Sequence, residues 1–150
     1  MEQVRCGVRG VFVAVSETAS VPVVVLESGD GRQLRICIGF WEAIAINSAL
    51  RKEVSSRPLT HDLFMDLMGR FSLVLHHLQI DSIEDGIFYA QLVISGNGHD
   101  DSLDCRPSDG MAVALKAEAP IFVEEEVLAD GGFSDVPFSE MIDLNSFIHL

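Results

Sequence analysis

Apolar and polar residues alternate along much of the first forty positions, and this period of two predicts β-strands. Val4 to Val15 alternates in this way, with its apolar face shifting after Gly10. Val21 to Leu26 is continuously apolar and β-branched, as in a strand buried on both faces. Residues 28–31, Ser-Gly-Asp-Gly, predict a hairpin turn into another strand, Gln33 to Ile38. The first quarter of the chain is therefore expected to supply three strands.

The apolar positions take on a helical period after Gly39. Residues 39–51 carry a wide apolar stripe, which predicts a first helix. A second helix is predicted from His61 to Arg70, with Thr60 as its N-cap. A third is predicted over residues 107–118, with a proline in its first turn. The apolar residues expected to face inward from the second helix are Leu63, Phe64, Leu67, Met68 and Phe71.

Further strands are predicted in the second half of the chain, at residues 72–80, residues 87–94, a short segment ending near Asp104, and residues 120–123. Asp85-Gly86 is a strong hairpin signal between the first two. The order of elements, strands interleaved with three helices, predicts a domain that contains both strands and helices.

The last segment, residues 129–150, is expected to be a C-terminal extension of that domain. It is too apolar for a disordered tail. Residues 138–148 are expected to dock, as a helix, on their own domain or on a neighbouring subunit.

Composition sets the class of protein. With 150 residues, 48% apolar and 22% charged, the chain is expected to fold around one core. It contains no apolar run long enough to span a membrane and no signal-peptide pattern at the N-terminus. Its 3 cysteines are widely spaced, which predicts reduced thiols rather than disulfides or a zinc site. A cytoplasmic location without a membrane partner is the resulting expectation.

The charge distribution restricts the choice of ligand. The formal net charge is −13, and residues 100–150 carry most of it, with 12 acidic and 2 basic side chains. Such a field repels a polyanion, because nucleic-acid affinity comes largely from Lys and Arg. A role on RNA or DNA would therefore need a local basic spot or a bound divalent cation.

Two segments concentrate chemistry at predicted helix starts: residues 57–62, Arg-Pro-Leu-Thr-His-Asp, and residues 104–109, Asp-Cys-Arg-Pro-Ser-Asp. Each places a cation, a hydroxyl and a carboxylate beside free backbone N–H donors. The same pattern also caps ordinary helices, so both interpretations stay open. The sequence has no dinucleotide-binding fingerprint, Walker A loop, nucleophile elbow or zinc-protease motif.

Two other sites of interest lie outside these segments. Glu42 is the single acid in the apolar run at residues 40–46, so it is expected either to face water or to meet a cation. His76 and His77 are neighbours in a predicted strand and are expected to point to opposite faces, which argues against a two-histidine site.

Five ordered motifs carry a family resemblance, at residues 38–43, 57–64, 85–90, 106–109 and 119–123. Together they resemble the bifunctional nuclease domain. The resemblance covers residues 4–128. It implies an α+β fold: a single compact, usually self-associating domain with a mixed, mostly antiparallel sheet packed by about three helices. It also implies a nuclease, with activity on both RNA and DNA in some members. One departure is Gly110, where the family usually has alanine. The positions that match the motifs are Glu42, Arg57, Thr60, His61, Asp62, Asp104, Arg106, Ser108 and Asp109.

The leading hypothesis from the sequence is a nuclease that hydrolyses phosphodiester bonds with Mg²⁺ or Mn²⁺ and no organic cofactor. Asp104 and Asp109 would hold the metal, and His61 would transfer a proton, with Asp62, Asp109 and Glu42 as the other candidate catalytic groups. Arg57, Thr60, Arg106 and Ser108 would contact the substrate. The alternative is a non-catalytic homo-oligomeric module, dimeric or higher, that binds a small anionic ligand or a partner protein.

Overall fold

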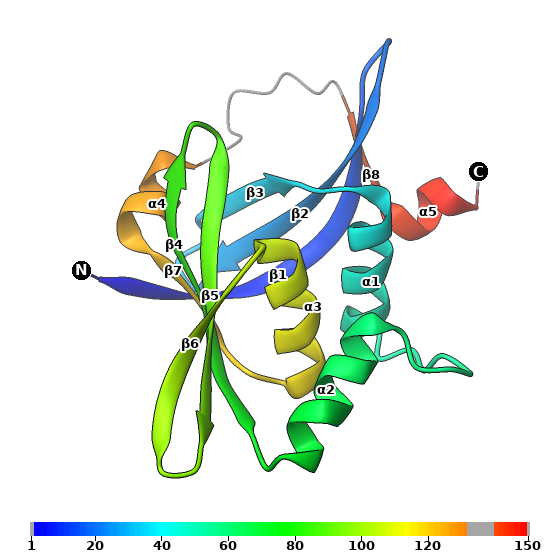
Figure 1. The fold of residues 1–150 in the computed structure, drawn as a ribbon. Helices are drawn as coiled ribbons and strands as arrows, with labels where there is room; N and C mark the ends of the chain where they lie inside the picture. Colours follow the sequence, from blue (N-terminus) through cyan, green and yellow to red (C-terminus); the bar gives the residue numbers. More distant parts are fainter. Residues whose placement is uncertain (1, 132–139, 150) are drawn as a thin grey trace.

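One mixed sheet organises the molecule (Figure 1). The computed structural model describes residues 2–131 and 140–149, in which the sheet has eight strands. Their order in space is β3-β2-β1-β7-β4-β5-β6, and β8 also pairs with β1. In this part of the chain β4 and β7 run parallel and the other pairs run antiparallel. The strands are β1 (Gln3–Val15), β2 (Ser20–Ser28), β3 (Gln33–Cys37), β4 (Val74–Glu84), β5 (Ile87–Gly96), β6 (His99–Cys105), β7 (Ile121–Glu124) and β8 (Glu140–Asp143).

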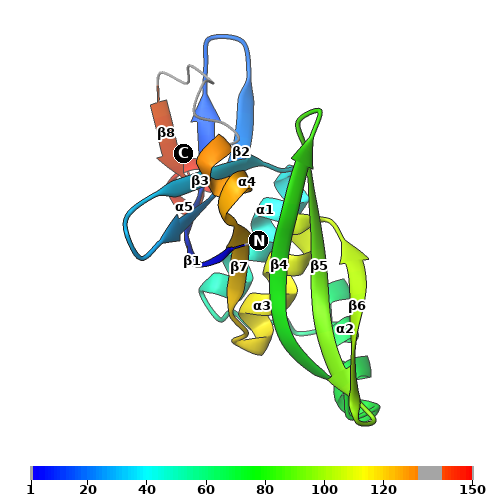
Figure 2. The same cartoon turned by 90° about the vertical axis from the view of Figure 1, so that its left-hand side faces the viewer.

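Three longer helices lie together on one side of this sheet (Figures 1 and 2). They are α1 (Phe40–Leu50), α2 (Thr60–Arg70) and α3 (Pro107–Ala117). The central one, α3, packs against α1, α2, β4 and β5. The short α4 (Glu125–Asp130) packs against β4 and β7, and α5 (Leu144–Ile148) against β1. The predicted α+β domain with about three substantial helices is confirmed.

The strand β1 is long because it serves two neighbours along one edge. Its first residues pair with β7, and Phe12 to Val15 pair with β8. The register against β2 shifts between Val8 and Gly10, which confirms the change of face predicted from the sequence.

The C-terminal segment, residues 140–149, differs from its prediction. Residues 138 and 139 of the expected helix over 138–148 lie outside the described residues. Glu140–Asp143 is a strand on β1 rather than a helix, and a helix begins only at Leu144. Asp143 starts that helix, because its carboxylate accepts the backbone N–H groups of Asn145 and Ser146.

The inward face predicted for α2 is partly wrong. Met68 is buried and Phe64 packs against the core, but Leu63, Leu67 and Phe71 are each more than half exposed. The apolar side chains of α2 extend over a wider part of its surface than α3 covers, so some of them remain exposed. No helix in the described ranges is long and apolar enough to cross a membrane.

The two neighbouring histidines of β4 also depart from expectation. A register shift between Leu75 and His77 interrupts the alternation of the strand. The Nδ1 atoms of His76 and His77 consequently lie 2.8 Å apart instead of on opposite faces. The prediction failed because it assumed a regular strand.

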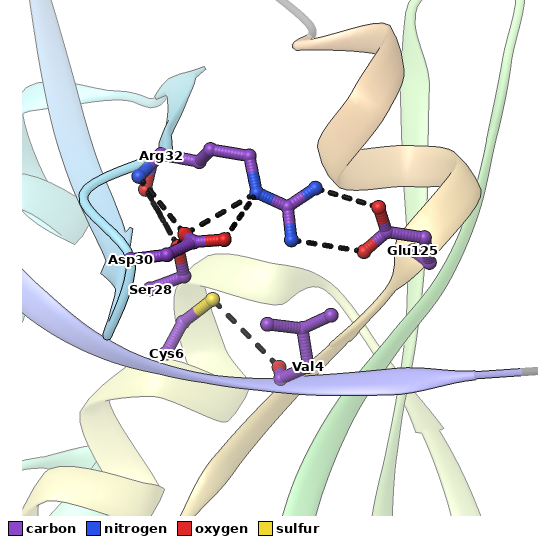
Figure 3. A network of polar contacts seen from close by, with 6 residues as sticks. All are labelled: Val4, Cys6, Ser28, Asp30, Arg32 and Glu125. Carbon is purple, nitrogen blue, oxygen red and sulfur yellow. Dashed lines mark hydrogen bonds and ion pairs between the residues drawn. The ribbon is translucent and has the colours of Figure 1, made fainter.

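A polar network joins the β2–β3 hairpin to α4 (Figure 3). The Arg32 guanidinium donates to both Glu125 oxygens, at 2.6 and 3.1 Å, and also pairs with Asp30. Beneath it, the buried Cys6 thiol contacts the Val4 carbonyl oxygen at 3.7 Å. Burial raises the pKa of Cys6 to about 11, so this sulfur stays protonated at neutral pH. Cys6, Cys37 and Cys105 are all free thiols.

Candidate active site

The ionisable residues that come together belong to the starts of three helices. Glu42 lies in the first turn of α1, His61 in the first turn of α2, and Asp109 in the first turn of α3. Arg106 is the N-cap residue of α3. Pro107 follows it and favours the extended backbone that Arg106 adopts. The helix starts thus bring together four side chains from three separate parts of the sequence.

Arg106 is at the centre of this cluster. Its Nε and Nη2 atoms donate to the two oxygens of Asp109, at 2.9 and 3.2 Å, and its Nη1 donates to Glu42 Oε1 at 3.3 Å. A guanidinium has five N–H groups, so these three bonds leave two for a ligand. The Arg106 side chain is 63% exposed, and a ligand can therefore reach those donors from solvent.

His61 completes the chain through Asp109. Its Nε2 lies 3.0 Å from Asp109 Oδ1. Burial acts to raise the pKa of Asp109, but hydrogen bonds from Arg106 and His61 outweigh it and hold that pKa below 3.8. The carboxylate is therefore ionised at neutral pH and accepts the Nε2 proton. This fixes the tautomer of neutral His61 and leaves its Nδ1 lone pair able to take up a proton.

A cavity of about 410 Å³ opens beside the cluster. Its wall carries Glu42, Arg106 and Ser108, and its lining includes Ile38 and Phe88. The Glu42 carboxylate folds over Gly39, so closely that a Cβ at residue 39 would collide with Glu42 Oε2. Glycine at this position therefore allows Glu42 to reach Arg106. The expectation that Glu42 meets water or a cation is resolved in favour of the cation.

Asp62 has a different place from its neighbour His61. It accepts from Lys116 Nζ at 2.6 Å and from the Leu59 backbone N–H at 2.9 Å. Leu59, not Thr60, is the N-cap residue of α2, so the predicted Thr60 cap is wrong and Asp62 supplies the side-chain bond. Sequence patterns contain little indication of Lys116 as the partner of Asp62, because the two residues are 54 positions apart.

We expect Asp62→Asn to lower the free energy of unfolding at pH 7 by about 1 kcal/mol, because this ion pair is partly exposed and screened. The hydrogen bond from Lys116, followed by that from Leu59, lowers the pKa of Asp62 below 3.8. A depressed pKa stabilises the fold above pH 3.8 and loses this effect as the pH falls through the folded-state value. Urea titrations from pH 3 to 7 should show a weaker acid dependence in the variant; an identical dependence would contradict the assignment.

The other predicted site residues lie around the cluster or apart from it. Ser108 is buried on the cavity wall, whereas Arg57 and Thr60 are exposed and do not belong to the chain from Glu42 to His61. Asp104 is on the opposite face of β6 from Cys105, because neighbouring strand residues alternate. Cys105 points at α3, since its sulfur would lie 3.1 Å from a Cβ on Gly110. Asp104 therefore points away from the helix that carries Asp109.

The donor set expected for a metal ion is not assembled. Both oxygens of Asp109 already accept hydrogen bonds, and Asp104 points to the other side of the sheet. Across residues 2–131 and 140–149, no three His, Cys, Asp or Glu side chains are grouped to hold a cation. The oxygens of these residues do not form a binding site for Mg²⁺ or Mn²⁺. No catalytic step is therefore assigned to a metal.

Comparisons with known proteins agree with this arrangement of motifs. An uncharacterized protein of Mycobacterium tuberculosis strain H37Rv is 40% identical over 126 residues, covering 83% of this chain and 75% of that protein. Bifunctional nucleases 1 and 2 of Oryza sativa subsp. japonica are 25% and 24% identical, and the match covers 38% and 41% of their lengths. The family model for the bifunctional nuclease domain matches residues 24–135. The chain belongs to the bifunctional nuclease domain family.

Proposed function

We propose that this protein is a nuclease that hydrolyses phosphodiester bonds in RNA or DNA. The observation that carries the proposal is the hydrogen-bonded chain from His61 through Asp109 and Arg106 to Glu42. It places a guanidinium with free donors on the wall of one open cavity, and a proton acceptor one carboxylate away from that guanidinium. The names of the rice relatives, bifunctional nucleases 1 and 2, support the same reaction class.

In this proposal each residue has one role. His61 takes a proton from the attacking water at Nδ1, and Asp109 holds the imidazole in the required tautomer. As the water oxygen bonds to phosphorus, the P–O bond to the leaving oxygen breaks, and that oxygen takes a proton from solvent. The two unused N–H groups of Arg106 bind oxygens of the phosphate and stabilise the charge that develops there. Glu42 and Asp109 hold the guanidinium in place. Asp62 stabilises the start of α2 and with it the position of His61.

We expect His61→Ala to reduce cleavage of a labelled single-stranded RNA and of a plasmid by about 100-fold, because a positioned base is removed. The matched control is His99→Ala, an exposed histidine at the start of β6 that is outside the cluster. Each protein is assayed with EDTA, Mg²⁺ and Mn²⁺, so that a metal requirement is read separately from the histidine requirement.

Three results separate the alternatives. Cleavage that His99→Ala keeps and His61→Ala loses supports the proposal, with or without added metal. Equal cleavage by all three proteins would assign the activity to another site or to a contaminant. No cleavage by the wild type under any condition would contradict the nuclease function.

A second candidate is the non-catalytic, self-associating module. The exposed residues Leu59, Leu63, Leu67 and Phe71 recur every four positions and form an apolar stripe along α2. The net charge of −13 also disfavours nucleic acid as a ligand. A second copy of the chain is the proposed occupant of this stripe.

Sedimentation velocity on the wild type and on Leu67→Asp tests this self-association. We expect the wild type to form a dimer or a larger species, and Leu67→Asp to lose it.

A further inference from the structure

Trp41 is an exposed aromatic side chain next to the candidate active site. It is the single tryptophan of the chain, lies in the first turn of α1 and is 82% exposed. The next residue, Glu42, is the one that binds Arg106. Trp41 does not line the cavity, and neighbouring side chains leave a helix about 100° apart. Consecutive Cα atoms are only about 3.8 Å apart, however, so a strand of a few nucleotides can contact both the indole and the guanidinium.

The backbone that carries Trp41 is held firmly. The ring of Phe40 stacks on Phe147 of α5, with centroids 6.0 Å apart. On the inner side of the helix, Ala43 and Ile46 are fully buried. These contacts fix the start of α1, so the indole projects from a rigid element while its own surface remains open to solvent.

Because the site carries a negative charge, contacts to phosphate alone would bind a nucleic acid weakly, and a ligand needs a further contact. Glu42 and Asp109 against Arg106 give the cluster a formal charge of −1 when His61 is neutral. The whole chain adds to this repulsion, with a net charge of −13. Stacking of a base on an aromatic ring does not depend on attraction of the phosphate, and every base has a face to offer. An unpaired base is accessible for stacking, whereas a base inside a duplex is not.

We propose that Trp41 stacks on an unpaired base of single-stranded RNA or DNA whose phosphate is bound at Arg106. The proposal rests on the proposed nuclease function and adds to it a substrate class and a binding residue. It predicts preference for single strands over duplexes, because only an unpaired base can stack on the indole while its backbone reaches the cluster.

The single tryptophan provides a direct test. Emission from Trp41 is followed while an uncleavable single-stranded oligonucleotide is added, with an abasic strand of equal length and charge and a duplex as controls. The single strand is expected to quench the emission at much lower concentration than either control. Equal quenching by the abasic strand would overturn the proposal, since it would show binding without stacking.

Variants supply a second readout through fluorescence anisotropy of the labelled strand. Trp41→Ala is expected to weaken binding about 5- to 100-fold, and Trp41→Phe to restore most of it, because a ring remains. Tyr89→Ala, an exposed aromatic of β5 that does not line the cavity, is the matched control and should bind as the wild type does.

The outcomes also separate this proposal from the function on which it rests. Stacking without cleavage would remove the nuclease function and keep Trp41 as a binding residue. Cleavage that is unchanged in KM and kcat by Trp41→Ala would keep the nuclease and remove the stacking role. A blue shift of the emission with protein concentration alone, without nucleic acid, would assign Trp41 to contact with a second copy and overturn the proposal.

Discussion

Replacing Asp109 by asparagine is expected to lower the cleavage rate by roughly two to four orders of magnitude. The carboxylate accepts from His61 on one oxygen and from Arg106 on both. An amide has one oxygen and one NH₂ group. Its NH₂ group must therefore face an N–H group of either His61 or Arg106, and two donors cannot form a hydrogen bond. If the NH₂ group faces His61, the imidazole changes tautomer and Nδ1 no longer has a free lone pair. If it faces Arg106, the guanidinium is displaced from the cluster.

The measurement is kcat/KM on a labelled single-stranded RNA, together with a thermal unfolding curve at the same pH. Asp66→Asn is the matched control, because Asp66 is also a helix carboxylate paired with an arginine, Arg70, but is outside the cluster. We expect Asp66→Asn to cleave as the wild type does. An Asp109→Asn protein that is folded and fully active would exclude Asp109 as the residue that holds the tautomer of His61.

The pH dependence of stability gives an independent check on Asp109. Burial opposes ionisation, but Arg106 and His61 lower its pKa below 3.8. The ionised form therefore stabilises the fold above this value, and the stabilisation is lost as the pH falls through the folded-state pKa. Asp109→Asn should remove this part of the acid dependence.

Most elements were predictable from the sequence because each depends on neighbouring residues. The turn at Asp85-Gly86 is formed with positive φ at both positions, the geometry that this pair favours between strands. Pro107 begins α3 because its ring suits the first helical turn and its missing N–H is not needed there. Such signals depend on local backbone chemistry, so they survive in the folded structure.

The site depended on pairings that local patterns do not contain. His61 and Asp109 are 48 residues apart, and Glu42 and Arg106 are 64 apart. The sequence identified these residues as candidates, but their contacts follow from the packing of three helices. Asp104 was grouped with Asp109 because it is close in the chain, whereas the alternation of β6 turns it to the other face. Closeness in sequence was misleading where a strand ends and a helix begins.

Gly110 is a buried residue of α3, and the structure shows why a glycine fits at this position. A Cβ built on it would lie 2.5 Å from Leu78 Cδ1 and 3.1 Å from the Cys105 sulfur. Leu78 is fully buried between the sheet and α3, so it has little room to move. A glycine inside a helix loosens that helix by roughly 1 kcal/mol relative to alanine. In the structure it also lets α3 approach β4 closely.

We therefore expect Gly110→Val to lower the free energy of unfolding by about 1–3 kcal/mol, measured by urea denaturation. Gly69→Val is the matched control, because a Cβ on this α2 residue would meet no atom within 4 Å. That control should be neutral or slightly stabilising, since valine is a better helix former than glycine.

The combination of Gly110→Val with Leu78→Ala distinguishes steric overpacking from a helix effect. If the new side chain clashes with Leu78, the truncation makes room for it, and the double variant is more stable than the sum of the single changes predicts. If valine acts only on the helix, the two losses add.

Gly110→Val also connects the core to the site, because Arg106 and Asp109 are at the start of α3. A displaced α3 moves both away from Glu42 and His61, so cleavage should fall with stability in Gly110→Val and recover in part in the double variant.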